Sequence, residues 1–292
     1  MAIILSSLTV NFLRTGYKLL QKTLLNKGLD EYLILWAITL GTIVISLLLL
    51  VIPIPKTDWL FWAVCIGSAL SWLIGDILDI KATKITDISI IAPIYAFGII
   101  FTGILAWIIL GEIPSLIGFI GIILIIIGAY FLELREFNIN KIHLPFKIIF
   151  TNKGTWLILI AFFFYSLNNV LDKIGIAHTN NLLFYGIINH IIAMTIFTII
   201  IHKKIISNKK VILDNKTSLI ILGILNLTFS LIGLSLYKFM EVVYVAAIFN
   251  LSILFEIIGG HFMFKEDNFR NRLIAGLLII LGITLIFMDK IQ

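Results

Sequence analysis

Charged residues are scarce in this sequence, and their scarcity excludes an ordinary soluble domain. Charged residues make up 13% of the 292 positions, whereas soluble domains carry about 25%. Hydrophobic residues account for 60%, and the mean hydropathy is +1.11. Apolar stretches recur along the whole chain, and many reach the roughly 18 residues that a helix needs to cross a bilayer. The composition therefore predicts an integral membrane protein.

Cysteine, histidine and proline are also rare, and each narrows the range of functions. A single cysteine, Cys65, excludes an internal disulfide, and five scattered histidines show no metal-ligand spacing. The chain contains no Gly-x-Ser-x-Gly elbow, Gly-x-x-x-x-Gly-Lys phosphate loop or His-Glu-x-x-His motif. Among the five prolines, Pro93 stands well inside a predicted span and should kink it. We predict no enzyme, no cofactor and no metal.

The apolar stretches predict helices and not the strands of a barrel. In lipid every backbone polar group needs an internal partner, which leaves helices or closed barrels. Continuous apolar runs such as residues 43–54 lack the alternation of barrel strands. We predict ten spans, at residues 2–25, 32–53, 59–80, 87–110, 113–134, 154–177, 182–202, 217–239, 242–264 and 270–289.

The last third of each half of the chain follows the same plan. Glu112 lies 154 residues before Glu266, and Gly128 lies 154 residues before Gly282. Five spans in each copy is an odd number, so the second copy must enter the membrane in the opposite direction, as in many secondary transporters. We therefore predict an all-α integral membrane protein with ten transmembrane helices in two inverted five-helix repeats. The predicted parts are repeats at 1–134 and 154–292 and a linker at 135–153.

Polar side chains inside the spans are the candidates for function. A charge at the bilayer centre costs about 2.5–3.5 kcal/mol, so each one needs a partner, a watery cavity or a route to the interface. Asn11, Arg14 and Lys18 form a polar stripe on the first helix because they are three and four residues apart. Arg14 is either a substrate contact or the ion-pair partner of Glu256, and Glu256 is either that partner or a proton-carrying acid.

Several segments carry a family resemblance. They are residues 166–173, the two units at 106–112 and 260–266, and the glycine-punctuated segments 121–128 and 276–282. With these motifs the chain resembles the EamA-type branch of the drug/metabolite transporter superfamily. The resemblance implies a central cavity lined by the first, third, fourth, sixth, eighth and ninth helices. Those helices hold the predicted substrate-binding residues: Arg14, Lys18, Asp76, Tyr95, Asn169, Asp172, Asn226 and Glu256.

The loop charges bear on orientation and partners. With ten spans, the loops on the side of the termini carry three basic residues and the opposite loops carry sixteen, which favours cytoplasmic basic loops. The family resemblance implies cytoplasmic termini instead, so the sequence leaves the orientation open. The net charge of +6 lies mostly in loops, where contact with lipid headgroups is a better explanation than nucleic-acid binding.

These observations together predict a multi-pass carrier in the cell (cytoplasmic) membrane. It would move a small polar metabolite such as an amino acid, or a drug-like compound, by alternating access, with a proton or an exchanged solute as the coupling partner. Arg14 and Lys18 favour an amphoteric or anionic substrate. The alternatives are a lipid-linked sugar flippase and another non-carrier membrane protein such as a channel. The sequence predicts no particular oligomer.

Overall fold

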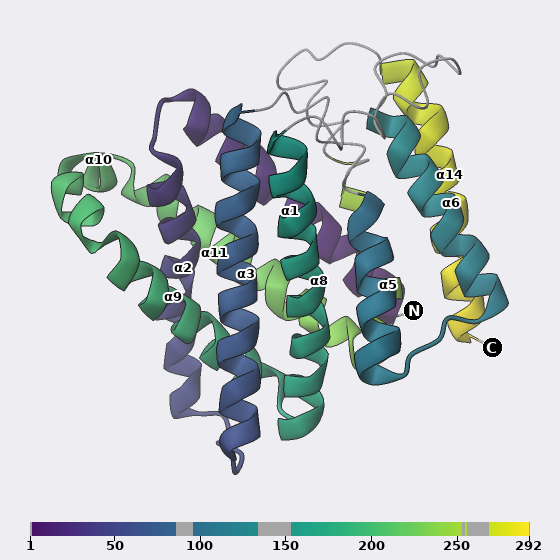
Figure 1. The fold of residues 1–292 in the computed structure, drawn as a ribbon. Coiled ribbons are helices and arrows are strands. Elements are labelled where there is room, and N and C mark those ends of the chain that lie inside the picture. Colours follow the sequence, from purple (N-terminus) through teal and green to yellow (C-terminus); the bar gives the residue numbers. More distant parts are fainter. Residues whose placement is uncertain (1, 86–95, 134–152, 253–254, 256–268, 292) are drawn as a thin grey trace. The chain divides into compact units, whose positions relative to one another are not determined.

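The described part of the chain is helical, as predicted. The computed structural model describes residues 2–85, 96–133, 153–252, 255 and 269–291, and within these ranges it contains no strand. Figure 1 shows helices α1 (Ala2–Asn26), α2 (Glu31–Ser46, continued by a 3-10 turn at Leu47–Leu50), α3 (Trp59–Ile85), α5 (Ala96–Leu110), α6 (Leu116–Glu133), α8 (Lys153–Thr179), α9 (Leu182–Ser207), α10 (Lys209–Asp214), α11 (Lys216–Leu236), α12 (Val242–Phe249) and α14 (Phe269–Ile291).

Five helical segments are long and apolar enough to cross a membrane, and each coincides with a predicted span. They are Glu31–Leu50, Trp59–Ala82, Lys153–Thr179, Leu182–Ser207 and Lys216–Leu236. The polar stripe of α1 lowers its hydropathy, and α1 is not among the five. Shorter apolar segments lie in α5, α6 and α14. The count of ten spans and the inverted repeats stay predictions.

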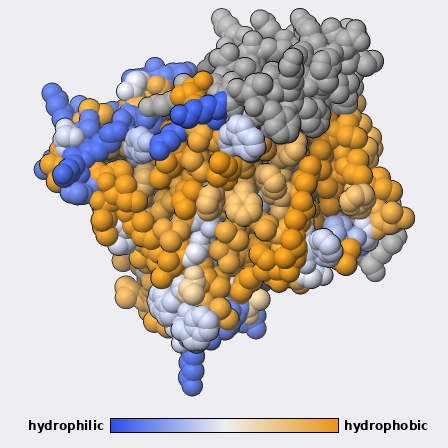
Figure 2. Space-filling view, in the orientation of Figure 1, coloured by the Kyte–Doolittle hydropathy of each residue, from blue (hydrophilic) through white to orange (hydrophobic). Residues whose placement is uncertain are grey.

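The surface fits a membrane environment. Large apolar side chains such as Phe12, Trp107 and Ile199 are exposed, and the face drawn in Figure 2 is mostly hydrophobic over the helices. An exposed apolar belt is stable where lipid replaces water around it. The chain is therefore a multi-pass membrane protein that is helical in the residues that the structure describes.

The helices group into two compact units, and each unit takes residues from both halves of the sequence. Unit 1 comprises Met1–Leu73 and Leu171–Lys238, and unit 2 comprises Ile74–Val170 and Phe239–Gln292. The division falls within α3 and within α8. The predicted linker at 135–153 lies outside the described residues except for Lys153, which begins α8.

Unit 1 is held together by close helix packing. In this unit α11 packs against α1 and α2, and α9 packs against α2. Gly41 of α2 and Gly223 of α11 meet backbone to backbone, since a Cβ on Gly223 would lie 2.6 Å from the carbonyl oxygen of Ala37. Small residues at a crossing let two helix backbones approach closely, which is the main source of helix association where water does not drive it.

The turn between α1 and α2 is specified locally. Gly28 adopts φ +81°, a conformation that suits glycine, and its N–H bonds the Leu25 carbonyl at 2.9 Å. Leu29 N–H bonds the Leu24 carbonyl at 3.2 Å, which completes a Schellman motif. Asp30 then caps α2 by accepting the N–H of Tyr32 at 2.9 Å. The sequence therefore ends one helix and starts the next within five residues.

In unit 2, α6 and α14 run antiparallel and side by side. Ser115, which precedes α6, bonds Asp289 near the end of α14 at 2.5 Å. Farther along the pair Gly121 faces Gly282, and a Cβ on Gly121 would lie 2.7 Å from the Gly282 carbonyl oxygen. Figure 1 shows the two helices, in teal and yellow, in contact along their length. Gly121 and Gly282, which lie in the glycine-punctuated segments of the sequence, therefore serve packing.

The Gly-Glu motif after α5 has a structural role in unit 2. Gly111 adopts φ +69° and ends α5. The next residue, Glu112, accepts the N–H of Val242 at 2.8 Å, and Val242 is the first residue of α12. The first N–H groups of a helix have no acceptor within the helix. Glu112, from another segment, supplies an acceptor for one of them. Its counterpart in the predicted repeat, Glu266, lies outside the described residues.

Candidate functional site

The structure describes six of the eight predicted substrate-binding residues. Tyr95 and Glu256 lie outside the described residues, so the predicted pairing of Glu256 with Arg14 stays a prediction. In unit 1, Arg14 and Lys18 are half-buried on α1, and Asn226 of α11 is buried.

The remaining three predicted residues are divided between the units. Asp172 of α8 is buried in unit 1, with 8% of its surface exposed. Asp76 of α3 and Asn169 of α8 are half-buried in unit 2. Two of the three, Asp172 and Asp76, each accept a hydrogen bond from a tyrosine. The hydrogen-bonded groups around these two aspartates are the candidates for the functional site.

Asp172 stands at the centre of the first group. Its Oδ1 accepts hydrogen bonds from the Ser68 hydroxyl at 2.5 Å and from the Tyr185 hydroxyl at 2.7 Å. Asn189 donates from Nδ2 to the Ser68 oxygen at 2.8 Å and to the Cys65 carbonyl at 3.3 Å. We call Asp172, Ser68, Tyr185 and Asn189 the Asp172 cluster. It joins α3, α8 and α9 within unit 1.

Aromatic packing fixes the geometry of the Asp172 cluster. Gly175 lies against the Tyr185 ring, and a Cβ at that position would collide with the ring. Phe61 contacts Tyr185 edge to face, with 6.3 Å between the ring centroids. Phe61 also stacks on Phe184 at 5.6 Å. Because Tyr185 and Phe61 are both fully buried, the tyrosine hydroxyl has little freedom to leave the carboxylate.

The Asp172 cluster contains the kinds of polar groups that recognition sites use. A carboxylate accepts hydrogen bonds from hydroxyl or amine hydrogens, and it can also take up a proton or attract a cation. In the structure Asp172 accepts from two hydroxyl donors. A solute with hydroxyl groups offers donors of the same kind. Ionisable groups inside membrane helices are costly, so their presence commonly marks a functional site.

The second group lies in unit 2 and has a similar chemistry. The Tyr165 hydroxyl donates to Asp76 Oδ1 at 2.6 Å and lies 3.4 Å from Asp79 Oδ2. Gly75 makes room for the Tyr165 ring, since a Cβ there would lie 2.7 Å from the Cε1 atom. The neighbouring Ser166 donates to the Gly98 carbonyl at 3.1 Å. A tyrosine thus holds a half-buried carboxylate in unit 2 as well.

The α1 stripe divides into a buried part and a half-buried part. Asn11 and Thr15 are buried, and they bond carbonyl groups of α1 itself: Asn11 donates to Ser7 at 2.7 Å and Thr15 to Asn11 at 2.9 Å. Such bonds satisfy a polar side chain within its own helix. Arg14, Lys18 and Lys22 lie on the half-buried part, so α1 presents its three cations away from the fully buried face.

Four members of these two groups are missing from the predicted substrate-binding residues: Ser68, Asn189 and the two tyrosines, Tyr185 and Tyr165. Tyr185 lies four residues before Asn189, and Tyr165 lies seven residues before Asp172. A spacing of four or seven places two residues on one helix face, so a search for tyrosines on the polar faces of the spans would have found them. Their aspartate partners come from other helices, which no spacing within one helix predicts.

Within the described part of the chain no group of three or more histidine, cysteine, aspartate or glutamate side chains is arranged to hold a metal ion. The polar groups of the Asp172 cluster are hydrogen-bonded to each other and to the Cys65 carbonyl.

Comparisons with known proteins place the chain in a family. No curated protein matches the sequence. A solved structure titled only "Crystal structure of protein" matches with a TM-score of 0.71 and 13% sequence identity, over 99% of this chain and 97% of that one. At this identity the match shows a shared fold. The family described as "Sugar transport protein" matches residues 28–292. Because this match spans most of the sequence, the chain belongs to the sugar transport protein family, a family of membrane transporters.

Proposed function

We propose that this protein is a secondary carrier of the EamA type that moves a small hydroxyl-rich solute, of the sugar class, across the cytoplasmic membrane by alternating access. The observation that carries the proposal is the buried carboxylate of Asp172, held by hydroxyl donors from α3 and α9 in a member of a transporter family. The family description favours a sugar over the amino acid or drug-like compound that the charges of Arg14 and Lys18 suggest.

The groups of the Asp172 cluster suit a sugar. Carboxylate and carboxamide side chains can each serve two neighbouring hydroxyl groups, and aromatic rings pack against the apolar face of a sugar ring. Asp172 and Asn189 supply the polar groups, and Phe61, Phe184 and Tyr185 supply the rings within the same unit. Within unit 2, the Asp76–Tyr165 group by itself offers the same chemistry, a carboxylate next to an aromatic ring.

Counterflow in proteoliposomes tests the proposal. Vesicles containing the purified protein are loaded with one unlabelled solute from a panel of sugars and amino acids, and entry of the same labelled solute is measured. A carrier gives transient accumulation because its site alternates between the two sides, whereas a channel does not. We expect counterflow with at least one sugar. Its absence for every solute, or translocation of a lipid-linked sugar instead, would contradict the proposal.

A substitution connects transport to the site. Asp172→Asn keeps the size of the side chain and removes its charge. We expect counterflow to fall by at least about tenfold, because this is the effect of losing one hydrogen bond between the solute and a charged group. Asp214→Asn is the matched control because Asp214 is exposed on α10, and it should transport within about twofold of the unchanged protein. Both variants must elute as folded protein, and equal transport by Asp172→Asn would exclude Asp172 from the site.

A further inference from the structure

The segment that connects α9 with α11 combines charge and apolar surface in an unusual way. We call residues 203–216 the α10 corner. Lys203, Lys209, Lys210 and Lys216 are exposed there. Three large apolar side chains are also exposed in the corner: Ile206 at 73%, Val211 at 39% and Leu213 at 54%. Figure 2 shows this end of the molecule, around the α9 and α10 of Figure 1, as hydrophilic with hydrophobic residues between the polar ones.

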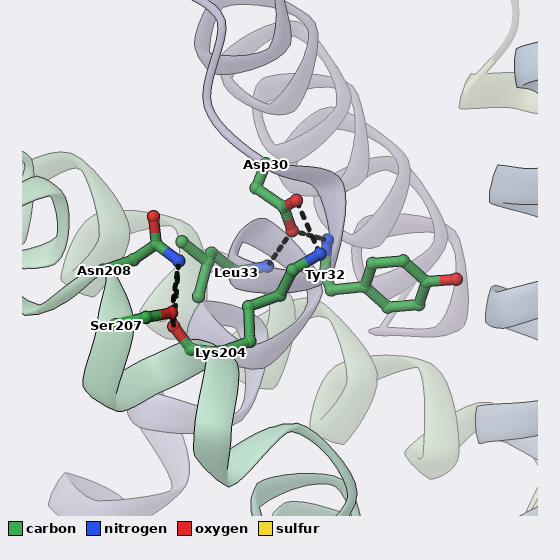
Figure 3. Close-up of polar contacts among 6 residues, drawn as sticks. All are labelled: Asp30, Tyr32, Leu33, Lys204, Ser207 and Asn208. Carbon is green, nitrogen blue, oxygen red and sulfur yellow. Dashed lines mark hydrogen bonds and ion pairs between the residues drawn. The ribbon is translucent and has the colours of Figure 1, made fainter.

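The α10 corner is an ordered turn. The carbonyl oxygen of Lys204 accepts hydrogen bonds from the Ser207 hydroxyl at 3.0 Å and from Asn208 Nδ2 at 2.9 Å. Asn208 Nδ2 also lies 3.1 Å from the Ser207 hydroxyl oxygen, and these residues appear together in Figure 3. The turn ends α9 and starts α10, so the exposed side chains of the corner project from a defined backbone.

One lysine of the corner, Lys204, forms an ion pair within the protein. Lys204 Nζ bonds Asp30 Oδ2 at 2.6 Å and lies 4.5 Å from the centroid of the Tyr32 ring (Figure 3). Both contacts tie the end of α9 to the start of α2. Lys204 therefore differs from the exposed lysines of the corner in its contacts. If a ligand binds the exposed lysines, replacing Lys204 should affect its binding less than replacing them.

Helix length places the corner at the membrane surface. Helix α9 has 26 residues, which is about 39 Å at 1.5 Å per residue, whereas the hydrocarbon layer is about 30 Å thick. The excess lies at the end that carries Lys203, because the first twenty residues of α9 contain no Asp, Glu, Lys or Arg. The lysines and the apolar side chains of the corner therefore lie near the headgroups, and not among the acyl chains.

We propose that the α10 corner binds anionic phospholipid headgroups of the surrounding bilayer. The exposed lysines contact the lipid phosphates, and Ile206, Val211 and Leu213 enter the boundary between headgroups and acyl chains. Charge complementarity supports this partner, since the corner carries five lysines and one acidic residue, Asp214. Clusters of lysines next to a membrane helix attract acidic lipid, and interleaved apolar residues anchor the same segment in the interface. The proposal is independent of what the protein transports.

Native mass spectrometry of the full protein in an uncharged detergent tests lipid binding. Phosphatidylglycerol or phosphatidylcholine is added, and the apparent affinity is taken from the lipid-bound fraction. We expect the unchanged protein to prefer phosphatidylglycerol. A variant with all four exposed lysines replaced by glutamine should bind phosphatidylglycerol at least about tenfold more weakly, since each lysine near a membrane surface adds to the attraction for acidic lipid. The substitutions are Lys203→Gln, Lys209→Gln, Lys210→Gln and Lys216→Gln. Raising the salt concentration should weaken binding by the unchanged protein.

Two controls separate this site from general charge. The first replaces four exposed lysines elsewhere by glutamine, at Lys56, Lys81, Lys153 and Lys238, and should leave the affinity within about twofold. The second, Lys204→Gln, should lower the stability of the protein and leave the affinity unchanged, because Lys204 is paired with Asp30. Equal affinity for the two lipids, or an equal loss in the first control and the corner variant, would overturn the proposal.

Discussion

Replacing Gly282 by alanine should separate α6 from α14, and the cost follows from the distances at their crossing. A Cβ on Gly282 would lie 2.5 Å from the Gly121 carbonyl oxygen, 2.7 Å from Ile125 Cγ1 and 3.1 Å from the Ile125 nitrogen. Two of these atoms belong to the backbone and cannot rotate away. The helices must therefore move apart by about 0.5–1 Å, and a gap of that size forfeits a quarter to a half of each van der Waals contact that it opens.

Gly16→Ala is the matched control for this substitution. Gly16 lies inside α1, and a Cβ there would meet no atom within 4 Å. Both substitutions gain the same helix propensity, about 1 kcal/mol, so the difference between them isolates the packing cost. Overpacking of a close contact costs about 1–3 kcal/mol. We expect Gly282→Ala to be less stable than Gly16→Ala by that amount, and toward its upper end because the obstacles are backbone atoms.

Reversible unfolding in mixed micelles with increasing dodecyl sulfate, followed by circular dichroism, measures the two free energies of unfolding. Gly16→Ala should be as stable as the unchanged protein or more stable, and Gly282→Ala should unfold at a lower denaturant fraction. Equal free energies for the two variants would refute the reasoning, because α6 and α14 would then cross with room for a methyl group.

Three further outcomes are expected. Asp30→Ala removes the carboxylate that caps α2 and pairs with Lys204, and should cost about 1 kcal/mol in the same unfolding assay, whereas Lys204→Gln should cost less because a part-exposed ion pair contributes little. Tyr185→Phe removes a buried donor to Asp172 and should cost about 1–3 kcal/mol; a Phe variant as stable as the unchanged protein would contradict this bond. The Phe61 N–H, helped by His178, holds the pKa of Asp58 below its ordinary value of 3.8, so the stabilisation is present above about pH 4 and is lost as the pH falls further. The stability difference between the unchanged protein and Asp58→Asn, followed by unfolding midpoints from pH 7 to pH 2.5, should therefore shrink at the acidic end.

The membrane character and the helical fold follow from the sequence alone. Hydrocarbon thickness sets the length of each apolar run, and the backbone must satisfy its hydrogen bonds within the segment, so both properties are local. For the same reason five predicted spans coincide with described helices that can cross a membrane. Local chemistry also marks helix ends such as Gly28 and Asp30.

The acidic members of the candidate site can likewise be found from the sequence. Asp172 and Asp76 stand out because a charge inside an apolar helix is rare and costly. Both lie in hydrogen-bonded groups in the structure. The predicted roles of all eight residues in substrate binding, Asp172 and Asp76 included, stay predictions, and so does their place in one central cavity.

Only the tertiary structure decided the partners of those acids. Tyr185 and Tyr165 belong to helices α9 and α8, while the residues that they bond belong to α8 and α3. Likewise Glu112, which has a repeated position in the sequence, bonds the first N–H of α12, 130 residues away. The pattern along a helix fixes which side chains share a face, but which face meets which neighbour depends on close packing at positions such as Gly175 and Gly75. That information is distributed over the whole chain, and no single segment contains it.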